Sequence, residues 1–264
     1  MKKLLDIKKL RVSIEGKLIV RDLSLVIQPG ELHVLMGPNG SGKSTVAQAL
    51  LGHPRYHVSA SRLLFNGKDI RKLKTDARAR LGIFLGFQYP LTVSGVTLAN
   101  LFSELTQTGK TKKSKRLYLT LASRMATEQR ESHDRLRTAV ESHMRELTLP
   151  EDILYRGLND GFSGGEKKKT EMLQMRALKP KLAILDEPDS GVDVDALKAI
   201  ARSINAARKE GTAILLITHY QRILKYLKPD AVHIMVKGKL VRSGTAALAR
   251  EVERKGYGTV SRNL

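Results

Sequence analysis

The stretch ELHVLMGPNGSGKST, Glu31–Thr45, joins an apolar run to a glycine-rich loop and the start of a helix. Its second part, Gly37–Thr45, fits the pattern G-x-x-x-x-G-K-[ST]. The apolar residues before it predict a buried strand, and Ser44–Leu51 carries a helical pattern. A phosphate-binding loop lies between a strand and a helix in this way, so the stretch predicts an α/β fold with a polyphosphate site.

The residue types of the loop indicate how it binds a nucleoside triphosphate, which we expect to be ATP. Gly37, Gly40 and Gly42 allow the backbone to wrap closely around phosphates, while the loop N–H groups and the helix N-terminus meet the negative charge. Lys43 can reach the β- and γ-phosphates, and the Ser44 hydroxyl can coordinate Mg²⁺. The predicted nucleotide-binding residues of this segment are Gly37, Pro38, Asn39, Gly40, Ser41, Gly42, Lys43, Ser44 and Thr45.

A second segment supplies carboxylates. The run LAILDE, Leu182–Glu187, has four apolar residues typical of a central strand, followed by Asp186 and Glu187. We expect Asp186 to take part in the Mg²⁺ site from the end of this strand, and Glu187 to polarise the attacking water as the catalytic base. Together with the phosphate loop, the run predicts a Mg²⁺-dependent ATPase.

The rest of the chain predicts one domain over residues 1–264. Residues 1–88 and 163–264 form an α/β core with a β subdomain, and residues from about 89 to 162 form an inserted helical subdomain. The insertion includes Lys110–Arg116, in which five of seven residues are basic. Predicted strands are Arg11–Ile14, Leu18–Val20, Ser24–Ile27, Ala213–Thr218 and a hairpin of Ala231–Val236 with Lys239–Ser243; helices follow Gly165 and span Asp195–Arg208.

Composition limits the possible partners and chemistry. Lysine and arginine number 47 against 26 aspartates and glutamates, which gives a net charge of +21 at pH 7. Such an excess fits nucleic acid or an anionic membrane as partner, and equally a basic surface that is only solvated. No cysteine is present, so this chain holds no disulfide and no cysteine-ligated zinc or iron–sulfur cluster. No apolar run approaches the ~20 residues that cross a bilayer, and we expect a soluble, cytoplasmic protein without membrane insertion.

Three further polar segments narrow the class of ATPase. Gln88 lies in LGFQYP, the run FSGGE spans Phe162–Glu166, and His219 in ITHY follows a predicted strand. With the phosphate loop, the Leu182–Glu187 run and the loop Ser190–Asp193, they stand in the order typical of the ABC ATPase family, which the whole chain resembles. This resemblance implies a P-loop core of mixed sheet and helices, an antiparallel β subdomain and an inserted helical subdomain.

The family resemblance also implies residue roles. Gln88 senses the γ-phosphate and contributes to the metal site with Ser44 and Asp186, while His219 acts in catalysis with Glu187 and Lys43. In this family two cassettes enclose ATP between them, so the resemblance implies that two copies of this chain, each with one phosphate loop, dimerise on ATP and complete each other's site. The residues implied at that seam are Ser163, Gly164, Gly165, Glu166 and Asp193.

Within the family, the run GFSGGEKKKTEMLQM at Gly161–Met175 and FQYPLTVSGVT at Phe87–Thr97 resemble the ATPase subunits of Suf iron–sulfur cluster assembly systems. That resemblance implies SufB- and SufD-like scaffold proteins as partners. The alternative is the nucleotide-binding subunit of an ABC membrane transporter. Specific nucleic-acid binding is not expected, because the long coiled-coil insertions or paired cassettes of such family members do not fit 264 residues with one phosphate loop.

Three lysines, Lys167, Lys168 and Lys169, follow the FSGGE run. They are either a solvated helix face or a switch. In the switch hypothesis one of them pairs with Glu187 in the free subunit and holds the base away from water.

Overall fold

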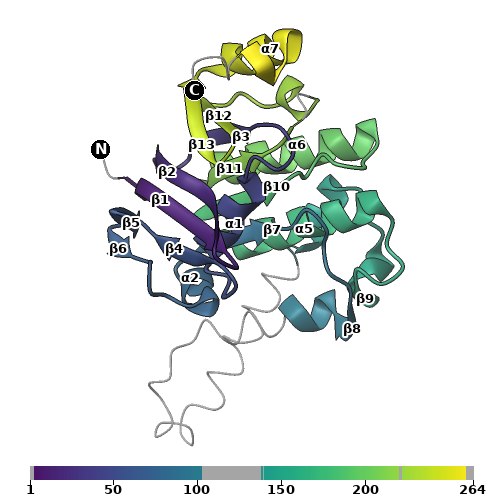
Figure 1. Ribbon diagram of the computed structural model, residues 1–264. Helices are drawn as coiled ribbons and strands as arrows, with labels where there is room; N and C mark the ends of the chain where they lie inside the picture. Colours follow the sequence, from purple (N-terminus) through teal and green to yellow (C-terminus); the bar gives the residue numbers. More distant parts are fainter. Residues whose placement is uncertain (1–2, 103–137, 139, 220–221, 260–264) are drawn as a thin grey trace, which may run out of the picture.

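The computed structural model describes residues 3–102, 138, 140–219 and 222–259 (Figure 1). Its centre is a six-stranded sheet in which five neighbouring strands are parallel and the sixth, at one edge, is antiparallel. The strand order is β13 (Lys239–Gly244), β12 (Ala231–Val236), β3 (Leu32–Met36), β11 (Ala213–Ile217), β10 (Leu182–Asp186) and β7 (Ile83–Gly86).

Different elements cover the two faces of this core sheet (Figure 1). One face packs on α5 (Gly164–Leu178), α6 (Val194–Lys209) and α7 (Ala246–Lys255). The other packs on α1 (Lys43–Leu51) and on an antiparallel sheet, with the short helix α2 (Thr75–Arg80) nearby. The chain thus has the layered α/β core and antiparallel β subdomain that the sequence predicts.

The antiparallel sheet comes from the first seventy residues. Its strands are ordered β2 (Lys17–Ile27), β1 (Leu5–Ile14), β5 (Arg62–Phe65) and β6 (Lys68–Asp69), and β4 (His57–Ser59) also pairs with β1. The predicted strands within residues 11–27 prove to be parts of two longer ones, and β4 to β7 are additional to the prediction.

The region between the two core segments is described in part. A small sheet pairs β8 (Val93–Thr97) with β9 (Gly157–Leu158), and residues 98–102, 138 and 140–146 are helical. Short 3-10 helices occur at Glu151–Leu154, Ile223–Lys225 and Tyr257–Thr259. The basic run Lys110–Arg116 lies outside the described residues.

The predicted hairpin β12–β13 is present and lies against the phosphate loop. Its turn residues Lys237 and Gly238 have φ values of 47° and 82°, as in a type I′ turn. A Cβ on Gly238 would lie 2.0 Å from the Ile19 carbonyl oxygen, and a Cβ on Gly37 would lie 2.1 Å from that of Met235. Only glycine fits at either position, so the hairpin packs against β2 on one side and the phosphate loop on the other.

Within the described ranges, no helix is both long and apolar enough to cross a membrane.

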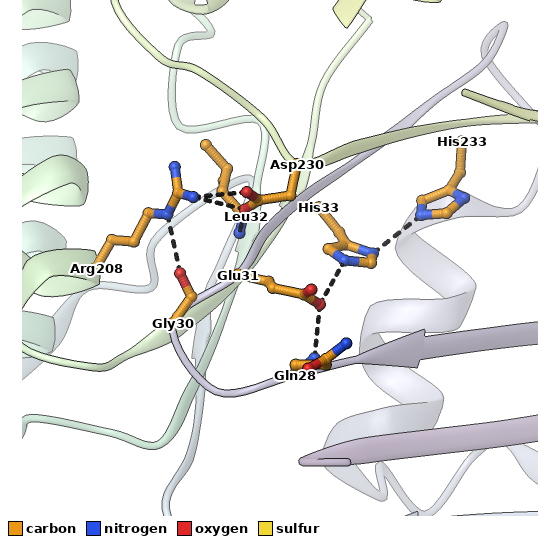
Figure 2. Close-up of polar contacts among 8 residues, drawn as sticks. All are labelled: Gln28, Gly30, Glu31, Leu32, His33, Arg208, Asp230 and His233. Carbon is orange, nitrogen blue, oxygen red and sulfur yellow. Dashed lines mark hydrogen bonds and ion pairs between the residues drawn. The ribbon is translucent and has the colours of Figure 1, made fainter. Parts of the chain in front are cut away.

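Two buried histidines join β3 to β12 through an ordered chain of hydrogen bonds (Figure 2). Glu31 Oε2 accepts from the Gln28 amide at 2.7 Å and lies 3.0 Å from His33 Nε2, so we assign the proton to that nitrogen. His33 Nδ1 then accepts from His233 Nε2 at 3.0 Å, and His233 Nδ1 accepts from the Ser243 hydroxyl at 2.7 Å. Each neutral imidazole therefore donates once and accepts once.

This arrangement predicts a loss of stability in mild acid. Burial, and then the nearby His33, lower the pKa of His233 to about 4. An unfolded histidine titrates near 6.5, so the unfolded state gains a proton as the pH falls below that value while the folded state does not. Between pH 6.5 and 4 the free energy of unfolding should fall by up to about 3 kcal/mol through this residue, and then level off.

Urea unfolding of the wild type and of His233→Gln across this pH range tests the effect. Glutamine does not titrate, so its curve should lack this part of the slope, and His57→Gln at an exposed position should keep it. Parallel curves for wild type and His233→Gln would contradict the prediction.

Candidate active site

The phosphate loop is shaped by left-handed glycines and filled by its own lysine. Gly40 and Gly42 have φ values of 75° and 100°, and Gly42 caps α1. Lys43 is buried, and its Nζ donates to the carbonyl oxygens of Gly37 and Pro38 at 2.8 and 3.1 Å. Burial lowers the pKa of Lys43, although the nearby carboxylates oppose the shift. The ammonium therefore sits inside the loop that the sequence assigns to phosphate.

Asp186 provides a cation-binding oxygen beside this loop. It ends β10, is buried, and shares a hydrogen bond with the Ser44 side chain at the start of α1. Burial raises the pKa of Asp186. Its Oδ1 has no hydrogen-bond partner among the residues that the structure describes. An unsatisfied carboxylate oxygen next to a hydroxyl is an oxygen-rich donor set that suits Mg²⁺.

Glu187 is held by two residues from other segments. It follows β10 in a left-handed conformation with φ of 50°, and its amide donates to the Ile217 carbonyl oxygen at 2.8 Å. Its side chain is 7% exposed. Gln88 Nε2 donates to Glu187 Oε2 at 2.8 Å, and His219 Nδ1 lies 2.8 Å from Oε1. The fold thus brings the three predicted residues together, and both carboxylate oxygens are engaged.

The FSGGE run begins α5, and its polar side chains cap that helix. Ser163 Oγ accepts from the Glu166 amide at 3.2 Å, and Glu166 Oε2 accepts from the Ser163 amide at 2.7 Å. These hydrogen bonds lower the pKa of Glu166. A Cβ on Gly164 would lie 3.4 Å from the Gly191 carbonyl oxygen, so the run is next to the loop that precedes α6.

Asp193 caps α6 in the same manner, with Oδ1 accepting from the Ala196 amide at 2.7 Å. Ser163 and Gly164 are exposed at the surface, and Gly165 and Glu166 are half-buried. Ser163, Glu166 and Asp193 bond within their own helix ends. Ser163 and Gly164, being exposed, are accessible to another molecule.

The lysine switch hypothesis is wrong for this structure. Glu187 bonds to Gln88 and His219, whereas Lys168 Nζ lies 3.5 Å from Glu171 Oε2 and donates to two backbone carbonyls. Lys169 Nζ donates to the Thr148 hydroxyl at 2.8 Å. Glu171, one helical turn away, is a closer partner for Lys168 than Glu187, which follows β10.

Two buried carboxylates near the site were not anticipated. Burial raises the pKa of Glu171 to about 7, with Lys168 opposing the shift. Asp189, also raised in pKa by burial, accepts from the Thr218 hydroxyl at 3.0 and 3.1 Å and so joins the segments that carry Glu187 and His219. One signal was available for Glu171, because it is one turn from Lys168 and shares a helix face with the buried Met175.

Known proteins resemble the chain over nearly its whole length. A family model described as ABC transporter matches residues 20–190. SufC of Escherichia coli (strain K12), described as a probable ATP-dependent transporter, is 44% identical over 259 residues, covering 97% of this chain and 98% of that protein. The probable ATP-dependent transporter ycf16 of Antithamnion sp. is 43% identical over 256 residues, covering 96% of each. A solved ATP-binding subunit of an ABC transporter has a TM-score of 0.76 at 22% identity, covering 98% of this chain and 100% of that one.

Proposed function

Because the chain belongs to the ABC transporter family of ATP-binding proteins and is an ATP-hydrolysing enzyme, we propose that it is the ATPase subunit of a Suf-type iron–sulfur cluster assembly complex. The observation that carries this proposal is the 44% identity to E. coli SufC across almost the entire length of both proteins. The missing cysteines agree with it, since a subunit that drives assembly does not itself need thiolate ligands for the cluster. We place its activity in the cytoplasm.

Each side chain of the site has a role in the hydrolysis of ATP to ADP and phosphate. Lys43 and the loop amides bind the β- and γ-phosphates, which draws the ammonium away from the Gly37 and Pro38 carbonyls. Glu187 accepts a proton from the attacking water after releasing one of its present partners, and His219 contacts the γ-phosphate.

Mg²⁺ fits the oxygen donors of Ser44, Asp186 and Gln88, and it would neutralise charge on the phosphates. Gln88 at present donates its amide to Glu187, so this assignment requires its side chain to turn.

A second copy of this chain completes the site. We assign Ser163, Gly164, Gly165 and Glu166 to the nucleotide of the partner copy, because Ser163 and Gly164 are exposed at this helix start and the N-terminus of a helix favours anions. Asp193, at the adjacent helix start, lies at the same seam. ATP bound between two copies thus drives dimerisation.

The scaffold partner binds beside Gln88. Apolar side chains are exposed along the segment that follows this residue, with Tyr89 78% and Leu91 72% exposed. Phe87, Val93 and Val96 extend this surface. Adjacent exposed apolar side chains mark an interaction site. We assign the surface to SufB- and SufD-like proteins and retain residues 89–162 as the proposed helical subdomain.

Co-purification tests the complex. The tagged chain, co-expressed with the SufB- and SufD-like proteins of its own organism, should retain both through size-exclusion chromatography, and Tyr89→Asp should release them because it buries a charge in the interface. Lys68→Asp, on an exposed strand of the antiparallel sheet, is the control. Retention of a membrane permease instead would establish the transporter alternative.

A further inference from the structure

Two side chains of α5 hold the backbone on either side of the peptide bond between Phe87 and Gln88. Lys168 Nζ donates to the Phe87 carbonyl oxygen at 2.6 Å and to the Gln88 carbonyl oxygen at 2.9 Å. Glu171 Oε1 accepts from the Phe87 amide at 2.7 Å. The two side chains also pair with each other at 3.5 Å. One helical turn therefore bonds both carbonyls and one amide of this dipeptide.

Both charged groups are deeply buried at this contact. Lys168 is 4% exposed and Glu171 is 6% exposed. Burying an ion pair costs desolvation free energy, and an apolar pair of similar size would pack here without that cost. An apolar pair, however, could not bond to the three backbone groups, which would then lose these partners in a partly buried position. What Lys168 and Glu171 provide, and an apolar pair would not, is a fixed position for the Phe87–Gln88 backbone.

We propose that Lys168 and Glu171 are positioning residues that fix Gln88 to the helix beginning at the FSGGE run. Through them, Gln88 is placed within hydrogen-bonding distance of Glu187. The inference rests on the proposed function, because it gives these contacts a part in ATP hydrolysis. When a second copy or a scaffold protein displaces either α5 or the segment after Gln88, the other moves with it, and the amide that bonds Glu187 moves too.

Steady-state kinetics separate positioning from nucleotide binding. Lys168→Met and Glu171→Leu should each lower kcat for ATP hydrolysis about tenfold or more, because a small misplacement of a site residue is costly. KM for ATP should stay within about twofold of wild type, because the phosphate loop is unchanged. Glu171→Gln keeps an acceptor for the Phe87 amide and should retain most of kcat. Lys169→Met is the matched control, since Lys169 lies on the same helix as Lys168 but bonds the Thr148 hydroxyl and not the Phe87–Gln88 backbone.

Amide exchange provides a readout independent of activity. In the full-length protein without nucleotide, the Phe87 amide should exchange faster in Glu171→Leu than in wild type, and Glu171→Gln should keep its protection. Should Lys168→Met not fold, the two Glu171 variants decide the question alone.

The proposal is overturned if Lys168→Met and Glu171→Leu both keep wild-type kcat. It is also overturned if Lys169→Met loses as much, or if the Phe87 amide exchanges equally fast in all variants. A wild-type chain that hydrolyses no ATP would instead overturn the proposed function, and the exchange measurement would still test the contact.

Discussion

Replacing Glu187 by glutamine is expected to slow ATP hydrolysis by about 10²–10⁴-fold, the usual contribution of a general base. The amide has the shape of the carboxylate but cannot accept a proton from water. Nucleotide binding should persist, because Lys43 and the phosphate loop are unchanged. With ATP bound and not consumed, the closed dimer should accumulate.

Phosphate release at saturating ATP measures the first effect, and size-exclusion chromatography in ATP measures the second. Glu253→Gln, an exposed change on α7, is the matched control and should behave as wild type in both. Wild-type turnover by Glu187→Gln would show that Glu187 is not the catalytic base. A strictly monomeric variant in saturating ATP would contradict a nucleotide site formed between two copies.

Replacing Lys43 by alanine is expected to weaken ATP binding until it can no longer be detected at ordinary nucleotide concentrations. The ammonium is buried within the phosphate loop and, among the residues that the structure describes, bonds the backbone carbonyls of Gly37 and Pro38, which it can exchange for phosphate oxygens. Hydrogen bonds to charged groups contribute about 1.5–3 kcal/mol each, so losing two of them raises Kd by about 100-fold or more.

Isothermal titration calorimetry with ATP checks this expectation. Lys68→Ala removes an equal charge from an exposed strand and should leave the affinity unchanged, which separates local contact from net charge. Thermal unfolding confirms that Lys43→Ala is folded. An affinity within about threefold of wild type would contradict the assignment of Lys43.

The parts of the fold predicted correctly are those where local pattern and tertiary role agree. The segment Glu31–Thr45 encodes strand, loop and helix in consecutive residues, and the apolar run before Asp186 is buried on both faces of its sheet. By contrast, β7 has only four residues and no flanking pattern that separates it from a helix. In β1, charged and apolar residues alternate irregularly because the strand pairs with three others and contains register shifts.

Buried charges show why the remainder could not be predicted. Arg78 lies in the sequence TDARAR, which indicates an exposed, polar helix. Its guanidinium is instead buried and donates to the carbonyl oxygens of Ala49 and Leu50 at the end of α1. Those carbonyls lie in the last turn of α1, where partners within the helix run out. Only the tertiary structure brings Arg78 close enough to bond them. The pairing of Lys168 with Glu171 is different, because the two residues lie one helical turn apart and their spacing in the sequence already indicates it.

The strand order has a consequence for synthesis of the chain. Strand β3, which leads into the phosphate loop, is made well before β11 and β12, its neighbours in the sheet. At ~5–20 residues per second, the ribosome adds the intervening ~200 residues in roughly 10–40 s. During that interval β3 has neither sheet partner, and the loop lacks the Met235 carbonyl against which Gly37 packs. The nascent chain therefore becomes able to bind ATP only after β11 and β12 have been made.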